Sequence, residues 1–355
     1  MPISIDSEEA TEALAARVRE ATRRRHSLKI IGANSKAFLG RRTSGRPLDL
    51  SGHRGVIAYE PSELVITARS GTRIDAIERL LAKHDQKLAF EPPNFGGGGT
   101  LGGMVAAGLS GPSRPFVGAV RDFVLGVTVM DGRGRSLRFG GTVFKNVAGF
   151  DAFRLMSGAM GCLGVLLDVS LRVTPRPRQQ RTLAFNEDWP RAQGRLTSLL
   201  GRPLPVTGAF HDGARLYLRL SGTERAVAHA ASTLGGDKAA LKIWNELRHM
   251  RHPFFAAPRL WRLSVPRTRS VDGLAGDWLI DWAGAQRWLV TPAPDGAVRD
   301  AARAAGGHAT LFHGVVDGED AFEPLSPPLM ALHQRLKAAL DPAGVFNRGR
   351  MYEGL

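Results

Sequence analysis

Cysteine is nearly absent from this sequence. The 355 residues contain a single one, Cys162. One cysteine excludes an intrachain disulfide. It also excludes a zinc or iron–sulfur site held by several thiolates of this chain.

Long apolar runs are absent as well. No stretch reaches the ~18 apolar residues that a membrane-spanning helix requires. The N-terminal sequence MPISIDSEEATEALAARVRE has no apolar core of the signal-peptide type. We therefore expect a cytoplasmic protein, with at most peripheral association with the inner face of the cytoplasmic membrane.

Lysine is scarce, yet the chain is strongly basic. Eight lysines accompany forty arginines, and the formal net charge is +15. Such a balance favours anionic partners, namely phosphates, nucleic acid, a membrane surface or an acidic subunit, unless it is only compositional drift. The arginines are spread along the chain, and no recognised basic motif or aromatic stacking pattern accompanies them. We therefore do not expect nucleic-acid binding.

The remaining composition is ordinary. A hydrophobic fraction of 43% and a charged fraction of 23% are typical of a soluble globular protein. The length suggests two domains, or one large domain with an insertion.

The first half of the chain combines helical and strand patterns. Helices are expected at residues 11–25 and 72–84. Strands are expected at residues 28–31, 55–60, 64–69, 87–90, 123–130, 136–139 and 163–174. Asp131-Gly132 predicts a hairpin between two of these strands. Pro175-Arg176-Pro177 ends the last strand and is the expected domain boundary.

Two α+β halves follow this boundary. The first has strands at 181–185, 206–211 and 216–220 and helices at 190–200 and 224–234. The second has strands at 260–265, 278–282, 288–291 and 308–312 and a helix at 296–305. We expect the halves to form one antiparallel sheet with helices on one face. A last helix at 327–340 and the tail DPAGVFNRGRMYEGL complete the chain.

Residues 95–111 read FGGGGTLGGMVAAGLSG, and eight of the seventeen are glycine. A flexible linker usually carries serine and charge, whereas this stretch continues into an apolar helix start. The favoured interpretation is a loop and helix start whose backbone amides approach a phosphate. The GxGxxG match within it is weak evidence for a Rossmann fold. That fold needs a strand running directly into the first glycine, and here Pro92-Pro93-Asn94-Phe95 intervenes.

Two other segments are rich in small residues. GANSK follows the strand at 28–31, and GFDAFRLMSGAMGCLG spans residues 149–164. Small residues let backbone lie against a ligand. Three such segments suit a long cofactor better than a mononucleotide.

These segments carry a family resemblance. The strings are IGANSKAFLGR, YEPSELVITARSGT, FEPPNF, TLGGMVAAGLSGPSRP, GAVRDFVLGV, FGGTVFKNVAGFD, RLMSGAMGCLGV and LDPAGVFNRGRMY. They resemble the FAD-binding subunits of bacterial glycolate dehydrogenases, also called glycolate oxidases. Those subunits belong to the vanillyl-alcohol oxidase and p-cresol methylhydroxylase family of flavoproteins. The likeness is dense over residues ~28–175 and clear in the tail, and several motifs in one order are more specific than one.

The resemblance implies an α+β architecture. An FAD-binding domain of two subdomains is expected at residues 1–177, and an α+β cap domain at 178–312. Residues 313–355 are expected to return to the flavin and complete the FAD domain.

The resemblance also implies which residues line the cofactor. The first pyrophosphate loop is Gly32, Ala33, Asn34, Ser35 and Lys36. The remaining expected positions are Ser70, Gly71, Thr72, Pro92, Thr100, Gly102, Gly103, Ala106, Gly108, Val120, Arg121, Asp122, Gly149, Gly158, Gly161, Val165, Asn347 and Arg348. Lys36 and Arg121 either add positive charge to the site or are solvated surface residues.

Histidine is the point of departure from the family. Many relatives bind FAD covalently through a histidine, but none lies in or beside these loops, so we expect non-covalent FAD. Some relatives that oxidise 2-hydroxy acids carry a histidine-based metal site in the cap. Here only His308 and His313 are near the expected place, so no metal is expected.

Arg262 is the candidate for binding a substrate carboxylate and His313 the candidate base, although both also suit ordinary cap residues.

The resemblance implies partner subunits as well. An iron–sulfur subunit would accept the electrons, because this chain cannot hold the cluster, and a sister flavin subunit would join the complex. The leading hypothesis is oxidation of glycolate to glyoxylate, or of D-lactate to pyruvate, within that complex. The alternatives are a stand-alone FAD-dependent dehydrogenase acting on another hydroxy acid or alcohol, and a non-catalytic FAD electron-relay subunit.

Overall fold

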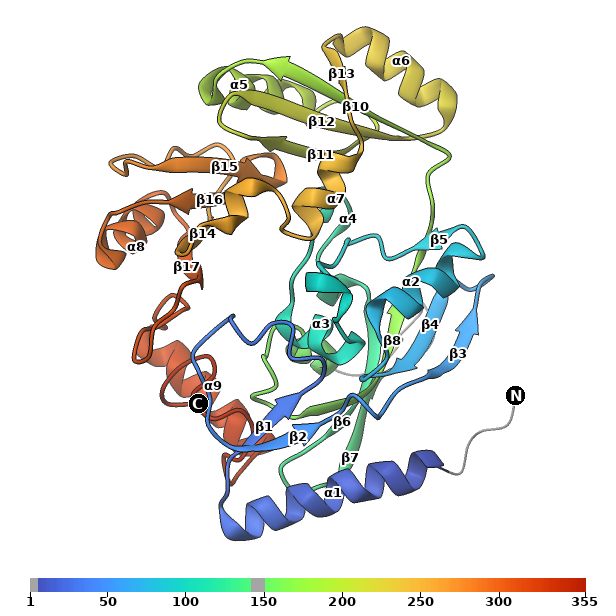
Figure 1. Ribbon diagram of the computed structural model, residues 1–355, viewed down its shortest axis with the longest axis vertical. Coiled ribbons are helices and arrows are strands. Elements are labelled where there is room, and N and C mark those ends of the chain that lie inside the picture. The colour runs from blue at the N-terminus through green and yellow to red at the C-terminus, as the bar shows by residue number, and fades with distance from the viewer. Residues whose placement is uncertain (1–5, 142–150) are drawn as a thin grey trace.

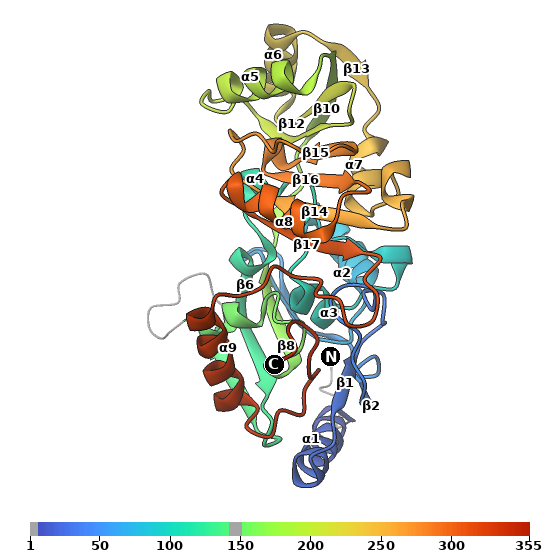
Figure 2. The same ribbon diagram turned by 90° about the vertical axis from the view of Figure 1, so that its left-hand side faces the viewer.

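The computed structural model describes residues 6–141 and 151–355. Gly149, one of the expected cofactor residues, lies outside these ranges. Two bodies are stacked along the long axis, and the C-terminal tail runs back from the upper body to the lower one (Figures 1 and 2). In the described part of the chain, no helix has the length and apolar character that a bilayer span needs.

The lower body is built on a five-stranded antiparallel sheet. Its strands follow the order β3-β4-β8-β6-β7. They are β3 (Val56–Glu60), β4 (Val65–Arg69), β6 (Val124–Met130), β7 (Ser136–Gly140) and β8 (Val165–Arg172). The pairing of β6 with β7 confirms the hairpin that Asp131-Gly132 predicted.

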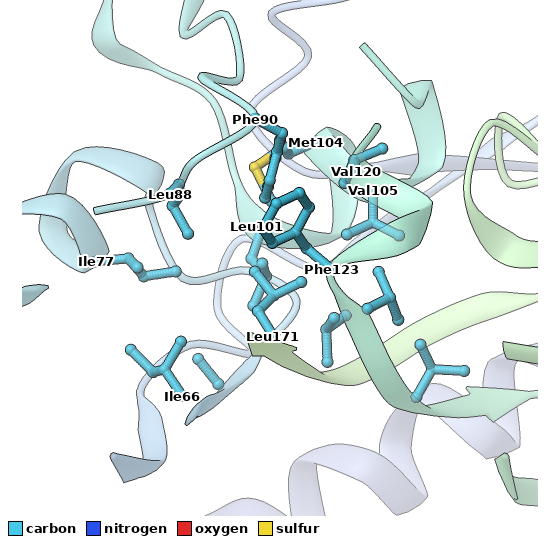
Figure 3. Packing of buried hydrophobic residues seen from close by; sticks show 14 of the residues in the cluster. Ile66, Ile77, Leu88, Phe90, Leu101, Met104, Val105, Val120, Phe123 and Leu171 are labelled. Carbon is cyan, nitrogen blue, oxygen red and sulfur yellow. The ribbon is translucent and has the colours of Figure 1, made fainter. Parts of the chain in front are cut away.

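Helices α2 (Ile74–Ala82) and α3 (Leu101–Ala107) cover one face of this sheet. Ile77 of α2 and Leu101, Met104 and Val105 of α3 share a buried core with sheet residues such as Leu171 (Figure 3). Burial of this apolar surface is the main stabilising term for the lower body. It fixes α3, and with it the glycine-rich segment, on the sheet.

The other face of the sheet meets a second, smaller unit. β1 (Leu28–Ile31) and β2 (Arg46–Asp49) pair in parallel. Their Leu28 and Leu48 share a core with α1 (Asp6–Arg24) and with Val165 and Leu167 of β8. The lower body thus consists of two packed subdomains.

The upper body is one eight-stranded antiparallel sheet in the order β13-β10-β12-β11-β15-β16-β14-β17. Its strands are β10 (Gln179–Asn186), β11 (Val206–His211), β12 (Arg215–Gly222), β13 (Asp237–Ala239), β14 (Leu260–Ser264), β15 (Asp277–Asp281), β16 (Gln286–Val290) and β17 (His308–His313). The two halves meet where β11 pairs with β15. The expected single sheet made from two halves is therefore confirmed.

The helices of the upper body lie where the pattern predicted. Helices α5 (Trp189–Leu199), α6 (Glu224–Leu234) and α8 (Asp295–Ala304) pack on one face of the sheet. The opposite face carries Phe210, Trp288 and Phe312, which form a core with α7 (Lys242–Arg248) and with Leu109 and Met160 of the lower body. This second face of the sheet therefore packs against the lower body.

The tail joins the two bodies. After β17 the chain forms α9 (Pro327–Leu340) and then lies beside β1, where Phe346 pairs with Leu28. Lys337 of α9 is buried and donates to Asp341 Oδ2 and to the carbonyls of Cys162 and Phe346. The tail thus returns to the lower body beside β1.

The remaining elements are short. They are β5 (Gln86–Lys87), β9 (Thr174–Pro175), α4 (Arg114–Val117) and the 3-10 turns Phe95–Gly97, Val120–Asp122, Ala152–Met156, Pro253–Ala256 and Trp282–Gly284. The strand expected at 87–90 is limited to Gln86–Lys87 because Leu88, Ala89 and Phe90 enter the core beneath α2 and α3.

Candidate functional site

A cleft opens between the two subdomains of the lower body. Its walls are the loop after β1, the start of α3, residues 156–166 and the tail. The empty volume, which includes the part open to solvent, is about 960 Å³.

The loop after β1 supplies backbone donors to the cleft. Within the described residues, the amides of Ala33, Asn34, Ser35 and Lys36 donate to no protein acceptor. Asn34 takes a left-handed conformation, with φ of 54°. Four consecutive unpaired N–H groups at the wall of a cleft suit an anion such as a pyrophosphate.

Lys36 adds a cation beside these amides. Its Nζ lies 5.5 Å from the centre of the Phe95 ring and 3.4 Å from Ser35 Oγ. No carboxylate of the described chain forms an ion pair with it. Burial lowers the pKa of Lys36 to about 8. A bound anion is the missing partner that this environment favours.

Glycine lets the walls of the cleft approach one another. A Cβ on Gly102 would lie 2.7 Å from Ser70 Cβ, and one on Gly32 would lie 2.4 Å from Thr100 Oγ1. Thr100 caps α3 by accepting from the Gly103 amide. The glycines at 32 and 102 therefore hold the first loop, β4 and α3 in close contact.

Part of the cleft lining is apolar. It is formed by Ile30, Ile31, Leu50, Ala106, Ala107, Met156, Ala159, Met160 and Leu166. One polar atom in this region is Ser70 Oγ, which is buried without a hydrogen-bond partner in the described protein. An apolar surface with an unsatisfied hydroxyl suits a large, flat, heteroatom-bearing ligand.

The tail closes the cleft through Asn347. Its Oδ1 accepts from the Ile30 amide at 2.8 Å, and its Nδ2 donates to the Met160 carbonyl at 2.7 Å. Arg350 donates to the carbonyls of Lys36, Ala37 and Arg41, and so holds the first loop. Arg348, by contrast, is exposed and donates only to Gly344 and Ala343 of its own turn.

Many of the expected cofactor residues line this cleft. They are Gly32, Ala33, Asn34, Ser35, Lys36, Ser70, Thr100, Gly102, Gly103, Ala106, Gly161 and Asn347. Sequence reasoning missed Lys29 and Arg350, which also line it. The motif FNRGR contains both Arg348 and Arg350, and it predicted an arginine at the cleft. The conformation of this turn decides that Arg350 rather than Arg348 lines the cleft.

Other expected residues lie outside the lining. They are Gly71, Thr72, Pro92, Gly108, Val120, Arg121, Asp122, Gly158, Val165 and Arg348. Val120 and Val165 are core residues, and Thr72 exchanges hydrogen bonds with Gly55. Arg121 is mostly exposed beside Asp122, so it adds no charge to the cleft.

A second pocket lies between the cap sheet and the lower body. Its empty volume is about 370 Å³, and residues 109–112 form one wall, next along the chain to the cleft-lining Ala106 and Ala107. Arg262 of β14 faces it, with its guanidinium carbon 5.4 Å from the centre of the Phe312 ring. Burial, reinforced by the neighbouring Arg114, lowers the pKa of Arg262 to about 10. Among the described residues no carboxylate or carbonyl pairs with this guanidinium.

The structure places His313 apart from this pocket. The residue ends β17 and is exposed, with its ring against Phe38 and its Nδ1 3.3 Å from the Ala257 carbonyl. His308 lies at the other end of the same strand. In the ranges that the structure covers, no three His, Cys, Asp or Glu side chains gather as metal ligands.

Comparison with known proteins bears on this site. Residues 8–140 match the family described as FAD binding domain. The glycolate oxidase subunit GlcE of Escherichia coli (strain K12) is 48% identical over 346 residues, which cover 97% of this chain and 98% of that protein.

More distant relatives share only part of their length. The glycolate oxidase subunit GlcD of Bacillus subtilis (strain 168) is 27% identical over 46% of this chain and 35% of its own length. A D-lactate dehydrogenase of Anaerostipes hadrus is 28% identical over 38% of this chain and 28% of its own length. The chain thus spans about a third of each of these two relatives.

A solved structure shares the fold. Alkyldihydroxyacetonephosphate synthase aligns over 95% of this chain and 75% of its own, with a TM-score of 0.66 and 14% sequence identity. This confirms the α+β fold of the vanillyl-alcohol oxidase type. The chain belongs to the family of the glycolate oxidase subunit GlcE, a family of FAD-binding oxidoreductase subunits.

Proposed function

We propose that this chain is the FAD-binding subunit of a glycolate dehydrogenase complex, which oxidises glycolate or D-lactate to the 2-oxo acid. The observation that carries the proposal is the pairing of two features in one molecule. One is the cleft with unpaired loop amides and Lys36, and the other is the adjoining pocket with unpaired Arg262.

The cleft fits FAD by the chemistry of its donors. The amides of residues 33–36 and the Lys36 ammonium would hold the pyrophosphate, and the small and apolar residues of α3 and of residues 156–166 would face the rings. Bound FAD would supply the oxidant by accepting a hydride from the carbon that bears the substrate hydroxyl. Among the described residues no histidine lines the cleft, which supports non-covalent binding.

The pocket fits a small acid. A guanidinium binds a carboxylate through two parallel hydrogen bonds, and Arg262 has no competing protein anion among the described residues. The surrounding Phe255, Trp288 and Phe312 exclude water and strengthen that ion pair. His313, the base candidate from the sequence, does not line this pocket and is not part of the proposal.

Partner subunits complete the proposal. GlcE and GlcD are named as subunits of glycolate oxidase. We propose a sister flavin subunit and an iron–sulfur subunit as partners. The single cysteine of this chain, which cannot ligate a cluster, supports the second of them.

The test is an anaerobic titration of the FAD-loaded chain with glycolate and with D-lactate, followed by the bleaching of flavin absorbance. We expect bleaching by at least one acid. Arg262→Met should raise the half-saturating acid concentration by about a hundredfold, since a charged hydrogen-bonded pair is worth roughly 3 kcal/mol. Arg225→Met on the exposed face of α6 is the control. A chain that holds FAD but is bleached by neither acid would instead support an electron-relay subunit.

A further inference from the structure

We propose that Asp281, assisted by Gln286, is the group that binds the substrate hydroxyl in the Arg262 pocket and accepts its proton. This inference rests on the proposed function and names a catalytic residue for it. It departs from the sequence-based assignment of the base to His313.

The sheet register brings the three side chains to one face. Asp281 of β15 pairs with Gln286 of β16, and Gln286 pairs with Ser264 of β14. Ser264 and Arg262 are two residues apart on one strand, so they share a face. All of Asp281, Gln286 and Arg262 line the same pocket.

The pocket carries polar groups that the described protein does not satisfy. Asp281 and Gln286 are 5% and 4% exposed, so both are more than nine-tenths buried. Asp281 Oδ1 accepts from the Trp282 amide at 2.7 Å, but no donor of the described chain reaches Oδ2. The Gln286 side-chain amide also has no hydrogen-bond partner there. Buried polar groups are normally paired, and three unpaired groups in one pocket indicate a polar ligand.

The chemistry of these groups matches the two ends of a 2-hydroxy acid. A guanidinium at one end takes the carboxylate. A carboxylate and an amide at the other end take a hydroxyl, which donates one hydrogen bond and accepts another. Leu247, Met250 and Phe255 contribute apolar walls. The other polar side chains of the lining are already engaged, since Ser110 accepts from the Val120 amide and Arg248 donates to the Pro92 carbonyl and to Glu78. The acid should therefore be short and without a second charge.

The environment of Asp281 suits a proton acceptor. Burial raises its pKa to about 7, despite the hydrogen bond from the Trp282 amide. The charged groups around it are Glu91 and its partner Arg219, with Arg248 and Arg262 on the pocket wall and Arg114 over the Trp282 ring. A base whose pKa lies near neutrality transfers protons efficiently at cellular pH.

The step balances with flavin as the oxidant. Asp281 Oδ2 would take the hydroxyl proton as the carbon–hydrogen bond breaks, and bound FAD would supply the two-electron oxidant that takes up the hydride. A carbon–oxygen double bond forms, so the hydroxy acid leaves as the 2-oxo acid. Asp281 then returns its proton to water.

The experiment uses the full FAD-loaded chain. Flavin reduction by glycolate is followed by anaerobic stopped flow from pH 5.5 to 9 for the wild type, Asp281→Asn, His313→Gln and the control Asp277→Asn. Asp277 is exposed at the start of the same strand. Binding of acetate, which carries one carboxylate and has no hydroxyl to oxidise, is measured by calorimetry for each.

We expect the wild-type rate to rise through pH 7 and level off above it, because Asp281 must be ionised to accept the proton. Asp281→Asn should lose at least about a hundredfold in rate and lose that pH dependence. It should still bind acetate with an affinity within about threefold of the wild type, because Arg262 is unchanged.

The possible failures are distinct. A wild type that binds no acetate and is not reduced by any hydroxy acid overturns the proposed function together with the inference. A wild type that is reduced, while Asp281→Asn is reduced at the same rate, overturns the inference alone. A large loss of flavin-reduction rate in His313→Gln, without one in Asp281→Asn, would also overturn the inference alone. Should Asp281→Asn not fold, a wild-type rate that is flat from pH 5.5 to 8.5 still contradicts the inference.

Discussion

At the scale of single residues, the sequence identified many side chains of the cleft but not their directions. Lys36 was assigned to an anion site because it follows a strand within small residues, and the structure places it in the cleft wall. Asp281 escaped notice because WLIDWAG reads as an ordinary strand end. Its burial depends on the pairing of β11 with β15, which no local pattern shows.

Lys36 predicts a pH dependence of cofactor affinity. An unliganded Lys36 with a pKa of about 8 is mostly charged below that pH. A bound phosphate favours the charged form and raises this pKa, so affinity for FAD should fall as the pH rises above 8. Lys36→Met should lose about tenfold in affinity at pH 7 and lose the dependence. Fluorescence titration between pH 6.5 and 9.5 measures this, with the exposed Lys242→Met as control. Parallel curves for the wild type and Lys36→Met would refute the role of Lys36.

Substitution of Gly103 should weaken cofactor binding without unfolding the protein. Apart from its own helix backbone, only Thr100 Oγ1, at 3.2 Å, lies near a Cβ built there, and the residue lines the cleft. Gly103→Val should therefore weaken FAD binding at least about tenfold while the apoprotein melts within a few degrees of the wild type. Gly194→Ala, in open space on α5, should change neither.

Gly97 is a different case. It has φ of 78°, so alanine costs about 1 kcal/mol of strain even though nothing lies within 4 Å. Gly97→Ala should lower the melting temperature slightly and leave FAD affinity unchanged. If Gly103→Val bound FAD normally, α3 would not be a cofactor wall.

At the scale of elements, periodicity and turn residues predicted most helices and strands. The strand β2 and the helix α7 were missed. RPLD has no alternation, and IWNELR is too short to show a helical period. Which turn of the tail faces the cleft was also beyond the sequence. Asn347 and Arg348 are adjacent, yet one is buried and the other exposed.

Because Asn347 is buried and the adjacent Arg348 is exposed, alanine variants of the two residues form a matched test and control. Asn347 joins β1 to the Met160 carbonyl by two hydrogen bonds. Asn347→Ala should therefore cost about 2–4 kcal/mol of stability and weaken FAD binding, because buried partners are left unpaired. Arg348→Ala should change stability by less than about 0.5 kcal/mol. Denaturant unfolding and FAD titration of both variants test the assignment, and equal effects would contradict it.

At the scale of the whole molecule, the two-body plan followed from the proline-rich boundary and the two α+β halves. The interface between the bodies did not, because its partners lie far apart in the sequence. Arg219 of β12 forms a buried ion pair with Glu91 at 2.9 Å. The Asn94 amide donates to His249 Nδ1, and the Trp282 indole donates to the Gly111 carbonyl. Burial lowers the pKa of His249 to about 4, which keeps it a neutral acceptor.

The Glu91–Arg219 ion pair predicts how the stability of the interface between the two bodies depends on pH. Burial alone would raise the pKa of Glu91, but Arg219 outweighs it and holds the pKa below 4.5. The stabilisation from Glu91 is therefore present above pH 4.5 and is lost as the pH falls through its folded pKa. Arg219→Met should cost about 3–5 kcal/mol near pH 7, since it leaves a buried charge unpaired.

The double variant Glu91→Gln with Arg219→Met separates pairing from packing. It should recover much of the lost stability, because no unpaired charge remains. Thermal unfolding of the three variants between pH 4 and 8 measures this. A single Arg219→Met variant as stable as the wild type would show that the pair contributes nothing to the interface.

The central claim is that the cleft between the subdomains holds FAD without a covalent bond. The most direct measurement is the visible spectrum of the purified chain, before and after acid precipitation. The account predicts flavin absorbance in the native protein, full release of FAD into the supernatant, and a Gly103→Val variant that folds but is colourless. A folded wild-type chain that is colourless and binds no added FAD would contradict the account, and flavin retained in the precipitate would contradict non-covalent binding.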